Sequence, residues 1–329
     1  MKKTTLQQLL IGVFSMFLLS PVAAQKKISG RSVPIRFSMA ESFATSKASN
    51  RVLKDQYASA LQVADLDQLP AGKPVRPYSV AVVIGVEHYN FMPMAPYAAR
   101  DAELIARYFK ALLGVDRVIV HTDDQVTGFF FDNLFNAAEG ELSRIIERGK
   151  TDLYVFYSGH GVPAADGKEM FLLPSDSKMR LIDKQGYSLN ALFEQLAQLP
   201  TKSTTIFIDA CFSGLGKFSQ AATPLNLMHT KGVKVKPLLH QPWLLNPNFR
   251  VFTSSSINQA ALVLDEARSG LFTYFLLLGL QGKADMDGDG HVTAGELSRY
   301  IHSNVAEMSR KIYQEQTPCF YGDDSFVFY

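Results

Sequence analysis

Short apolar runs alternate with amphipathic stretches from Tyr78 onward. The runs are apolar or β-branched at consecutive positions, which is typical of strands covered on both faces. The stretches that begin at Ala99, Phe131 and Ser188 carry apolar residues at helical spacing. This alternation predicts an α/β fold with a mainly parallel sheet and helices on both of its faces. The predicted strands are 79–85, 116–122, 151–157, 203–209 and 249–255.

The first 24 residues have the pattern of an export signal. Two lysines precede an apolar segment at 9–23, and small residues then indicate cleavage after Ala24. The segment is short for a transmembrane helix, although an uncleaved membrane anchor remains the alternative. We therefore expect an exported protein, periplasmic or secreted, with no stable membrane span once the signal is removed.

Residues 25–76 connect this signal to the alternating region. They are polar and weakly patterned, with one helix predicted at about 50–64 and a linker containing Pro and Gly after it. We interpret the segment as a polar linker or pro-segment. The sequence leaves open whether it is a spacer or an inhibitory arm.

Composition and charge narrow the class of function. The chain of 329 residues is 47% hydrophobic and 19% charged, the balance of a globular protein that buries a sizeable core. Its 33 Lys and Arg residues nearly balance 31 Asp and Glu, so no strong field favours nucleic acid or an anionic membrane surface. We therefore look for chemistry at a site and expect no nucleic-acid partner.

Two predicted strands end in residues that suit nucleophilic catalysis. The strand at 151–157 leads into Ser-Gly-His-Gly with His160, and the strand at 203–209 leads into Cys211. Catalytic groups of parallel sheets lie beyond the carboxyl ends of the strands, so neighbouring strands would bring the imidazole and the thiol together. Such a base increases the thiolate fraction of a nucleophile that attacks a carbonyl. The amides of Gly161 and Cys211 would then stabilise the oxyanion.

Other interpretations of these residues remain. A lone histidine or cysteine after a strand is more often packed or solvent-facing than catalytic. In an exported protein, Cys211 and Cys319, the two cysteines of the chain, could instead form a disulfide. The paired motifs with their flanking glycines favour a working thiol.

Together the two motifs resemble the caspase and metacaspase superfamily of cysteine peptidases. The motif YSGHG contains His160, and the motif DACFSG contains Cys211. The cysteine follows the histidine by about 50 residues, which is the spacing in caspases. The resemblance begins at Tyr78, continues to the end of the chain and is nearest to bacterial caspase-like peptidases. It implies a peptidase domain at 77–329 with a caspase-like three-layer α/β/α sandwich of roughly six strands, the last at 325–329.

The resemblance also assigns roles. His160 matches the general base, Cys211 the nucleophile and Gly161 the oxyanion-hole glycine. Caspases carry glutamine two positions before the cysteine, in a pocket that accepts aspartate. Metacaspase-like members carry aspartate at that position, and this chain has Asp209 there. Two further pocket residues of these members match Asp101 and Ser158.

The acidic residues of this pocket predict its substrate. An acidic, partly desolvated pocket favours a cationic side chain, so we expect cleavage after Arg or Lys. The alternatives are a helix N-terminal charge for Asp101 and a satisfied loop carboxylate for Asp209.

Residues 285–296 have the spacing of an EF-hand calcium loop, with Gly290 at the turn. Because the sequence has one such loop and sensors generally use pairs, we expect calcium as a structural clamp between two helices. A solvated acidic turn is the alternative. The expected ligands are Asp285, Asp287, Asp289, the carbonyl of His291, Thr293 and Glu296.

The segment at 217–247 interrupts the alternation of strands and helices. Caspase relatives are often cut in the corresponding part of the chain, and basic specificity would make self-cleavage here a testable hypothesis. A long basic surface loop is the alternative. Its lysines are Lys217, Lys231, Lys234 and Lys236.

The sequence therefore predicts an exported cysteine endopeptidase that cleaves peptide or protein substrates after Arg or Lys with a Cys-His dyad. Two alternatives use the same fold: a catalytically inactive, calcium-stabilised binding protein, and a cysteine hydrolase of a non-peptide acyl bond. The oligomeric state is left open.

Overall fold

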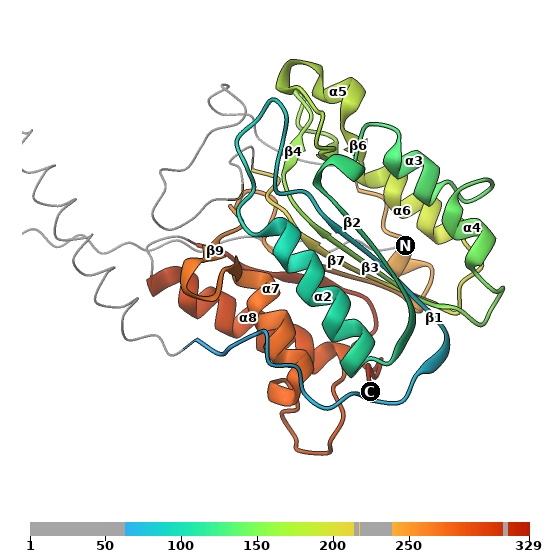
Figure 1. Ribbon diagram of the computed structural model, residues 1–329, viewed down its shortest axis with the longest axis vertical. Coiled ribbons are helices and arrows are strands. Elements are labelled where there is room, and N and C mark those ends of the chain that lie inside the picture. Colours follow the sequence, from blue (N-terminus) through green and yellow to red (C-terminus); the bar gives the residue numbers. More distant parts are fainter. Residues whose placement is uncertain (1–62, 214–216, 218–238, 312–314) are drawn as a thin grey trace, which may run out of the picture. The chain divides into compact units, whose positions relative to one another are not determined.

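A six-stranded sheet lies at the centre of the described chain (Figure 1). The structure, a computed structural model, describes residues 63–213, 217, 239–311 and 315–329. The export signal predicted at 1–24 and nearly all of the helix predicted at 50–64 lie outside the described residues. The strands of the sheet are β1 (Arg76–Gly85), β2 (Val115–Thr122), β3 (Asp152–Ser158), β7 (Ser203–Asp209), β8 (Phe249–Thr253) and β11 (Cys319–Tyr321).

The strands are arranged in the order β11-β8-β7-β3-β1-β2. All neighbours pair in parallel except β11, which runs antiparallel to β8. The prediction of a mainly parallel sheet is confirmed. Because the five parallel strands share one direction, their carboxyl ends reach the same edge of the sheet.

Helices cover both faces of the sheet and make it the middle layer of three (Figure 1). One face carries α2 (Ala98–Leu112), α7 (Leu271–Leu278) and α8 (Ala294–Lys311), and the other carries α3 (Phe130–Phe135), α4 (Glu141–Ile145) and α6 (Leu189–Gln198). Local signals set some boundaries: Ser188 caps α6 by accepting a hydrogen bond from the Ala191 amide at 3.1 Å.

Alternate residues of β1 enter two separate cores. Ala81 and Val83 pack with α2, α7 and α8, whereas Val80, Val82 and Ile84 pack with the helices of the other face. Both faces of the strand are therefore buried. This double burial explains why the strand sequences are apolar without interruption.

Shorter elements complete the described fold. They are a three-stranded antiparallel sheet, a two-stranded hairpin, one short helix and several single turns. Their bounds are β4 (Gly161–Pro163), β5 (Met170–Leu172), β6 (Tyr187–Ser188), β9 (Val263–Leu264), β10 (Ser269–Gly270), α5 (Ile182–Gln185), 3₁₀ turns at Asp123–Gln125, Met179–Leu181, Pro242–Leu244 and Asp265–Ala267, and a π-helical turn at Gly279–Lys283.

The helix predicted from Phe131 is two short helices in the structure. The chain leaves α3 at Asn136, whose Oδ1 accepts hydrogen bonds from the amides of Ala138 and Glu139 at 3.0 Å each. These bonds replace the helical hydrogen bonds and turn the backbone, so α4 starts anew at Glu141. The continuous helical periodicity concealed this break.

The prediction of a last strand at 325–329 is wrong. The sixth strand is β11, and the residues after it pair with the loop before α8 instead. Ala294 donates its amide to the Phe326 carbonyl at 2.7 Å, and Phe328 donates to the Val292 carbonyl at 2.9 Å. This course buries Phe328 completely against the sheet, whereas an edge strand would leave half of its side chains exposed.

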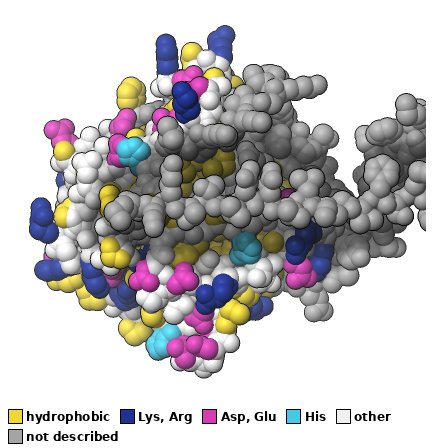
Figure 2. All heavy atoms as spheres, turned by 180° about the vertical axis from the view of Figure 1, so that it is seen from behind, with side chains coloured by type: hydrophobic (Ala, Val, Ile, Leu, Met, Phe, Trp, Pro, Cys, Tyr) yellow, Lys and Arg dark blue, Asp and Glu magenta, His cyan; other side chains and the backbone are white. Residues whose placement is uncertain are grey.

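The described surface carries both signs of charge. On the face in Figure 2, Lys and Arg side chains are interspersed with Asp and Glu. Among the described residues, no helix combines the length and the apolar composition needed to cross a membrane.

Phe207 joins three parts of the core, and its removal should be costly. Its ring lies 4.9 Å from that of Phe252, 5.7 Å from that of Phe109 and 6.2 Å from that of Phe328. We expect Phe207→Ala to lower the free energy of unfolding in urea by about 3–5 kcal/mol. The matched control is Phe129→Ala, at a ring that is 81% exposed, with a change within about 0.5 kcal/mol. Equal losses in the two variants would contradict the packing described here.

Candidate active site

The register of β3 against β7 brings the two predicted catalytic motifs together. Ser158 at the end of β3 stands opposite Asp209 at the end of β7. His160 and Cys211 each follow two residues later, so both leave neighbouring strands at the same level. Gly161 lies against the second motif, because a Cβ at this glycine would be 3.1 Å from the Cys211 carbonyl oxygen.

His160 is held in one orientation by the loop after β1. Its Nε2 lies 2.9 Å from the Pro93 carbonyl oxygen, which can only accept, so Nε2 carries the proton and Nδ1 holds the lone pair. The ring of Tyr89 lies 4.7 Å from that of His160, and its hydroxyl accepts the His160 amide at 2.8 Å. Among the described residues, Nδ1 is buried with no hydrogen-bond partner. The histidine therefore presents an unused basic nitrogen.

No motif in the sequence indicates which group orients His160. The structure supplies the Pro93 carbonyl and the Tyr89 side chain. A backbone carbonyl has no signature in the sequence, because every residue carries one. Tyr89 stands 71 positions before His160, and no short motif connects the two.

The environment of His160 keeps its imidazole neutral. Burial lowers the pKa of His160 from 6.5 to about 4; the Pro93 carbonyl opposes this change and the positive charge of Lys217 adds to it. At neutral pH the ring is therefore a proton acceptor. It is suited to take a proton from a thiol during attack.

Both cysteines are thiols in the structure, so the disulfide alternative is not realised. Cys211 is fully buried; its Sγ donates to the Gln259 carbonyl at 3.4 Å and lies 2.9 Å from the Ser213 hydroxyl. Cys319 lies at the start of β11 and points its thiol at the Thr317 carbonyl, 3.7 Å away.

The three predicted pocket residues meet in one buried cluster. Asp101 comes from α2, Ser158 from the end of β3 and Asp209 from the end of β7, and all three are completely buried. A fourth residue, Lys217, inserts its ammonium among them. Its Nζ lies 2.9 Å from Asp101 Oδ2, 2.8 Å from Ser158 Oγ and 3.0 Å from Asp209 Oδ2.

The turn into α7 closes this cluster. Ser269 donates its hydroxyl to Asp101 at 2.6 Å, the Gly270 amide donates to the same carboxylate at 3.1 Å, and Thr273 donates to Asp209 at 2.8 Å. A Cβ at Gly270 would lie 2.1 Å from Asp209 Oδ2 and 2.7 Å from Lys217 Nζ, so only glycine leaves room for the ammonium. No local pattern in the sequence indicates these residues, because they approach the cluster from more than 50 positions away.

Charge and burial oppose each other in the cluster. Burial raises the pKa of Asp101; the ammonium of Lys217 opposes this rise, and the neighbouring Asp209 adds to it. Burial alone would lower the pKa of Lys217, but Asp101 and Asp209 reverse the effect and raise it. Two buried carboxylates therefore share one charged ammonium. Asp209 Oδ1 has no hydrogen-bond partner among the described residues and is buried.

Three of the predicted metal ligands lie together in the loop before α8. One carboxylate oxygen from each of Asp285, Asp287 and Asp289 lies within 4.8 Å of the others, a cluster that could bind a metal ion. The Glu296 carboxylate instead accepts the Thr293 amide at 2.9 Å, and Thr293 Oγ1 accepts the Glu296 amide at 3.2 Å. This reciprocal pair is a capping box that starts α8.

The remaining predicted ligand, His291, uses its ring elsewhere. Its Nδ1 lies 3.0 Å from the Tyr329 carbonyl oxygen, so the ring faces the C-terminal residues. The predicted ligand was the main-chain carbonyl of His291, which this contact leaves available. The loop of the three aspartates is thereby joined to the tail that carries Phe328 into the core.

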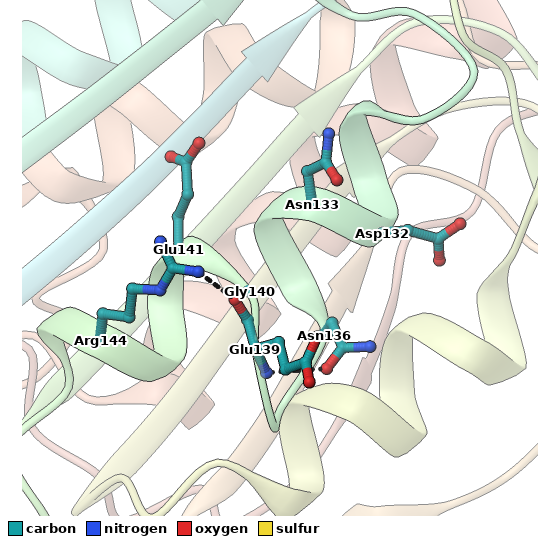
Figure 3. Close-up of a pocket in the computed structure, with 7 residues that line it drawn as sticks. All are labelled: Asp132, Asn133, Asn136, Glu139, Gly140, Glu141 and Arg144. Atoms are coloured by element: carbon teal, nitrogen blue, oxygen red, sulfur yellow. Dashed lines mark hydrogen bonds between the residues drawn. The ribbon is translucent and has the colours of Figure 1, made fainter.

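A surface pocket of about 410 Å³ lies elsewhere, between α3 and α4 (Figure 3). Figure 3 shows that the carboxylates of Asp132 and Glu141 point in different directions, and Arg144 donates to the Glu139 carbonyl at 3.0 Å. The residues that line it include neither a histidine nor a cysteine. The pocket follows from the break between the two helices and contains none of the predicted site residues.

One comparison with known proteins shows the family of this chain. A family model described as the caspase domain matches residues 78–329. Among solved structures, caspase-1 from Spodoptera frugiperda is similar, with 16% identity, a TM-score of 0.48 and coverage of 79% of this chain and 95% of that one. A search of curated proteins found no match.

The low pKa of His160 predicts a specific sensitivity to acid. The unfolded chain binds a proton at His160 near pH 6.5, whereas the folded protein resists it until about pH 4. The contribution of neutral His160 to the free energy of unfolding is therefore fully present above pH 6.5, and it is lost as the pH falls toward 4. Between pH 7.5 and pH 5, we expect the free energy of unfolding of wild type to fall by about 2 kcal/mol more than that of His160→Gln, as measured by urea unfolding.

The control for this experiment is His88→Gln. His88 is exposed, and its hydrogen bond to Asp123 raises its pKa, so its removal should not lessen the loss in acid. If His160→Gln lost as much stability as wild type, His160 would not be held neutral by burial.

Proposed function

The chain belongs to the caspase-domain family, and we propose on that basis that it is a cysteine endopeptidase that cleaves after Arg or Lys. The resemblance seen in the sequence is confirmed by the family match, and the fold is that of the caspase-family cysteine peptidases. One observation carries the proposed specificity: the cluster of Asp101, Ser158 and Asp209 already holds an ammonium group, that of Lys217.

The proposed reaction uses Cys211 as nucleophile and His160 as the proton carrier. His160 Nδ1 takes the thiol proton as Sγ forms a bond to the substrate carbonyl carbon, and the electron pair moves onto the carbonyl oxygen. The amides of Gly161 and Cys211 stabilise this oxyanion. His160 then gives the proton to the leaving amine, which breaks the peptide bond. Water attacks the thioester, and the thiol and a carboxylic acid are released.

The pocket residues support a cationic substrate side chain. Two buried carboxylates repel an aspartate and stabilise an ammonium or a guanidinium. Lysine would reproduce the three contacts of the Lys217 ammonium. Arginine has more donors than lysine, and Asp209 Oδ1 is a buried acceptor without a partner among the described residues. We therefore propose that the pocket accepts both residues.

We further propose that the loop at 285–296 binds calcium in a structural role. The gathered Asp285, Asp287 and Asp289 carboxylates fit a hard cation that prefers oxygen ligands. Gly290 has φ +83°, a left-handed conformation that favours glycine at the sharp turn of such a loop. The hydrogen bonds between this loop and residues 326–329 support a role in holding the C-terminal tail against the sheet.

Export to the periplasm or the medium is part of the proposal. It rests on the pattern of residues 1–24 in the sequence. The predicted self-cleavage at 217–247 concerns residues that, apart from Lys217 and 239–247, lie outside the described chain.

Hydrolysis of fluorogenic peptides tests the catalytic assignment. We expect release after Arg and Lys, no release after Asp, and a loss of about 10³-fold or more in Cys211→Ala because the nucleophile is gone. The matched control Cys319→Ala removes the other thiol and should retain activity. Turnover by Cys211→Ala equal to wild type would refute the nucleophile, and release after Asp alone would refute the acidic pocket.

Thermal unfolding in calcium tests the metal loop. With about 10 mM calcium we expect a stabilisation of about 1–3 kcal/mol for a site of extracellular affinity. Asp285→Asn with Asp289→Asn should abolish it, since asparagine keeps acceptors for the loop hydrogen bonds but removes the charge. Asp116→Asn, an exposed change on β2, is the control. An equal response in the double variant would exclude the loop as the calcium site.

A further inference from the structure

Lys217 is a charged side chain that the proposed reaction does not use. We propose that Lys217 is a built-in competitor of the substrate: its ammonium occupies the place of the substrate Arg or Lys and keeps the enzyme latent until it withdraws. This inference rests on the proposed function, because it assigns regulation to the same pocket.

The contacts of Lys217 are those of a bound ligand. An ammonium has three N–H donors, and three acceptors lie within 3.0 Å of Nζ, one each from Asp101, Ser158 and Asp209. The side chain is completely buried. These groups come from α2, β3 and β7, which are distant in sequence and converge on one cation.

The pocket cannot hold a second cation beside this one. The Lys217 side chain is fully buried, and even a methyl-sized addition at Gly270 would approach Nζ to 2.7 Å, so no space remains between Gly270 and the ammonium. A second buried positive charge would also be repelled by the first. A substrate side chain therefore enters only if Lys217 leaves.

Exchange of one cation for another is energetically feasible. Loss of the Lys217 ammonium alone would leave two buried carboxylates without a counter-charge, which is strongly unfavourable. An incoming ammonium or guanidinium replaces the lost charge and its hydrogen bonds. Lys217 stands six positions after Cys211, so it competes as an intramolecular ligand, at an effective concentration on the order of millimolar.

The catalytic residues are also closed in this state. Cys211 is 0% exposed and His160 is 1% exposed, so a substrate carbonyl has no access to the thiol. The charge of Lys217 adds to the burial that lowers the pKa of His160. Withdrawal of Lys217 would both empty the pocket and make His160 more basic.

A permanent counter-ion is the competing explanation for Lys217. In that case the ammonium would be a fixed part of the fold, and no external cation would replace it. The two explanations differ in whether an external cation displaces Lys217 from the wild-type pocket and in whether removal of Lys217 raises activity.

The first experiment is a rescue of stability in Lys217→Ala. We expect its Tm to fall by about 4 °C or more, and n-butylammonium, which matches the lysine side chain, to restore part of the loss. n-Butanol and sodium at equal concentration should have no such effect. Wild type and Lys168→Ala, a change at an exposed lysine, should not respond to the amine. Absence of an amine-specific rise in Lys217→Ala would overturn the proposal.

The second experiment measures peptide hydrolysis by Lys217→Ala and by Lys217→Met, which keeps an unbranched side chain if the alanine variant fails to fold. We expect kcat/KM for Arg and Lys peptides to rise about 10-fold or more over wild type, because the competitor is gone. Equal activity of wild type and variants would overturn latency and leave the peptidase proposal intact. Rescue by butylammonium without any peptide hydrolysis would support the proposal that Lys217 occupies a cation-binding pocket and would reject the proposed peptidase activity.

A third measurement uses wild type alone. Lys217 should resist acetylation in the resting protein and become reactive when a peptidyl-arginine aldehyde is added, as read by mass spectrometry. Inhibition by the aldehyde while Lys217 stays protected would show that both cations fit at once, and the proposal would be wrong.

Discussion

The parallel pairing of β3 with β7 is the constraint on which the site depends. With Ser158 opposite Asp209, the two strands end at one level. Two residues after these strand ends stand the candidate catalytic residues, His160 and Cys211. A shift of one residue would turn every side chain of a strand to the other face of the sheet. The same register therefore governs both the approach of His160 to the Cys211 loop and the convergence of the pocket residues. Core packing on both faces of the sheet maintains it.

Burial has opposite consequences in the two halves of the site. Around His160, burial favours a neutral ring, and the hydrogen bond to the Pro93 carbonyl places the remaining proton on Nε2, which leaves Nδ1 unprotonated. Around Asp101 and Asp209, burial makes charge tolerable only when a cation is present, and Lys217 supplies it. A pocket that requires a cation for its own stability is well suited to select one from a substrate. The proposed specificity and the proposed latency would then have the same electrostatic origin.

The C-terminal tail connects the loop of Asp285, Asp287 and Asp289 to the middle layer of the fold. Residues 326–329 pair with the loop before α8, and Phe328 reaches Phe207 and Phe252 in the sheet. Stiffening of the loop by a cation would therefore act on the packing of β7 and β8. The capping box of Thr293 and Glu296 gives α8 its own start signal. The proposed role of a metal ion at this loop is therefore stabilisation of the C-terminal tail.

The sequence by itself determined the layers of the fold, because apolar runs and helical periodicity are local and both faces of the strands are buried. It also located the residues at the strand ends, since the two motifs carry His160 and Cys211 within a few positions of each strand. The sequence did not predict the helix break at Asn136 or the course of residues 325–329, because each depends on hydrogen bonds that compete with a regular element. Only the tertiary structure decided that Lys217 fills the acidic pocket, that Gly270 leaves room for it, and that a carbonyl of the loop after β1 orients His160. Those contacts join segments far apart in the chain, and a lysine, a glycine or a carbonyl looks the same in sequence whether it is solvated or buried.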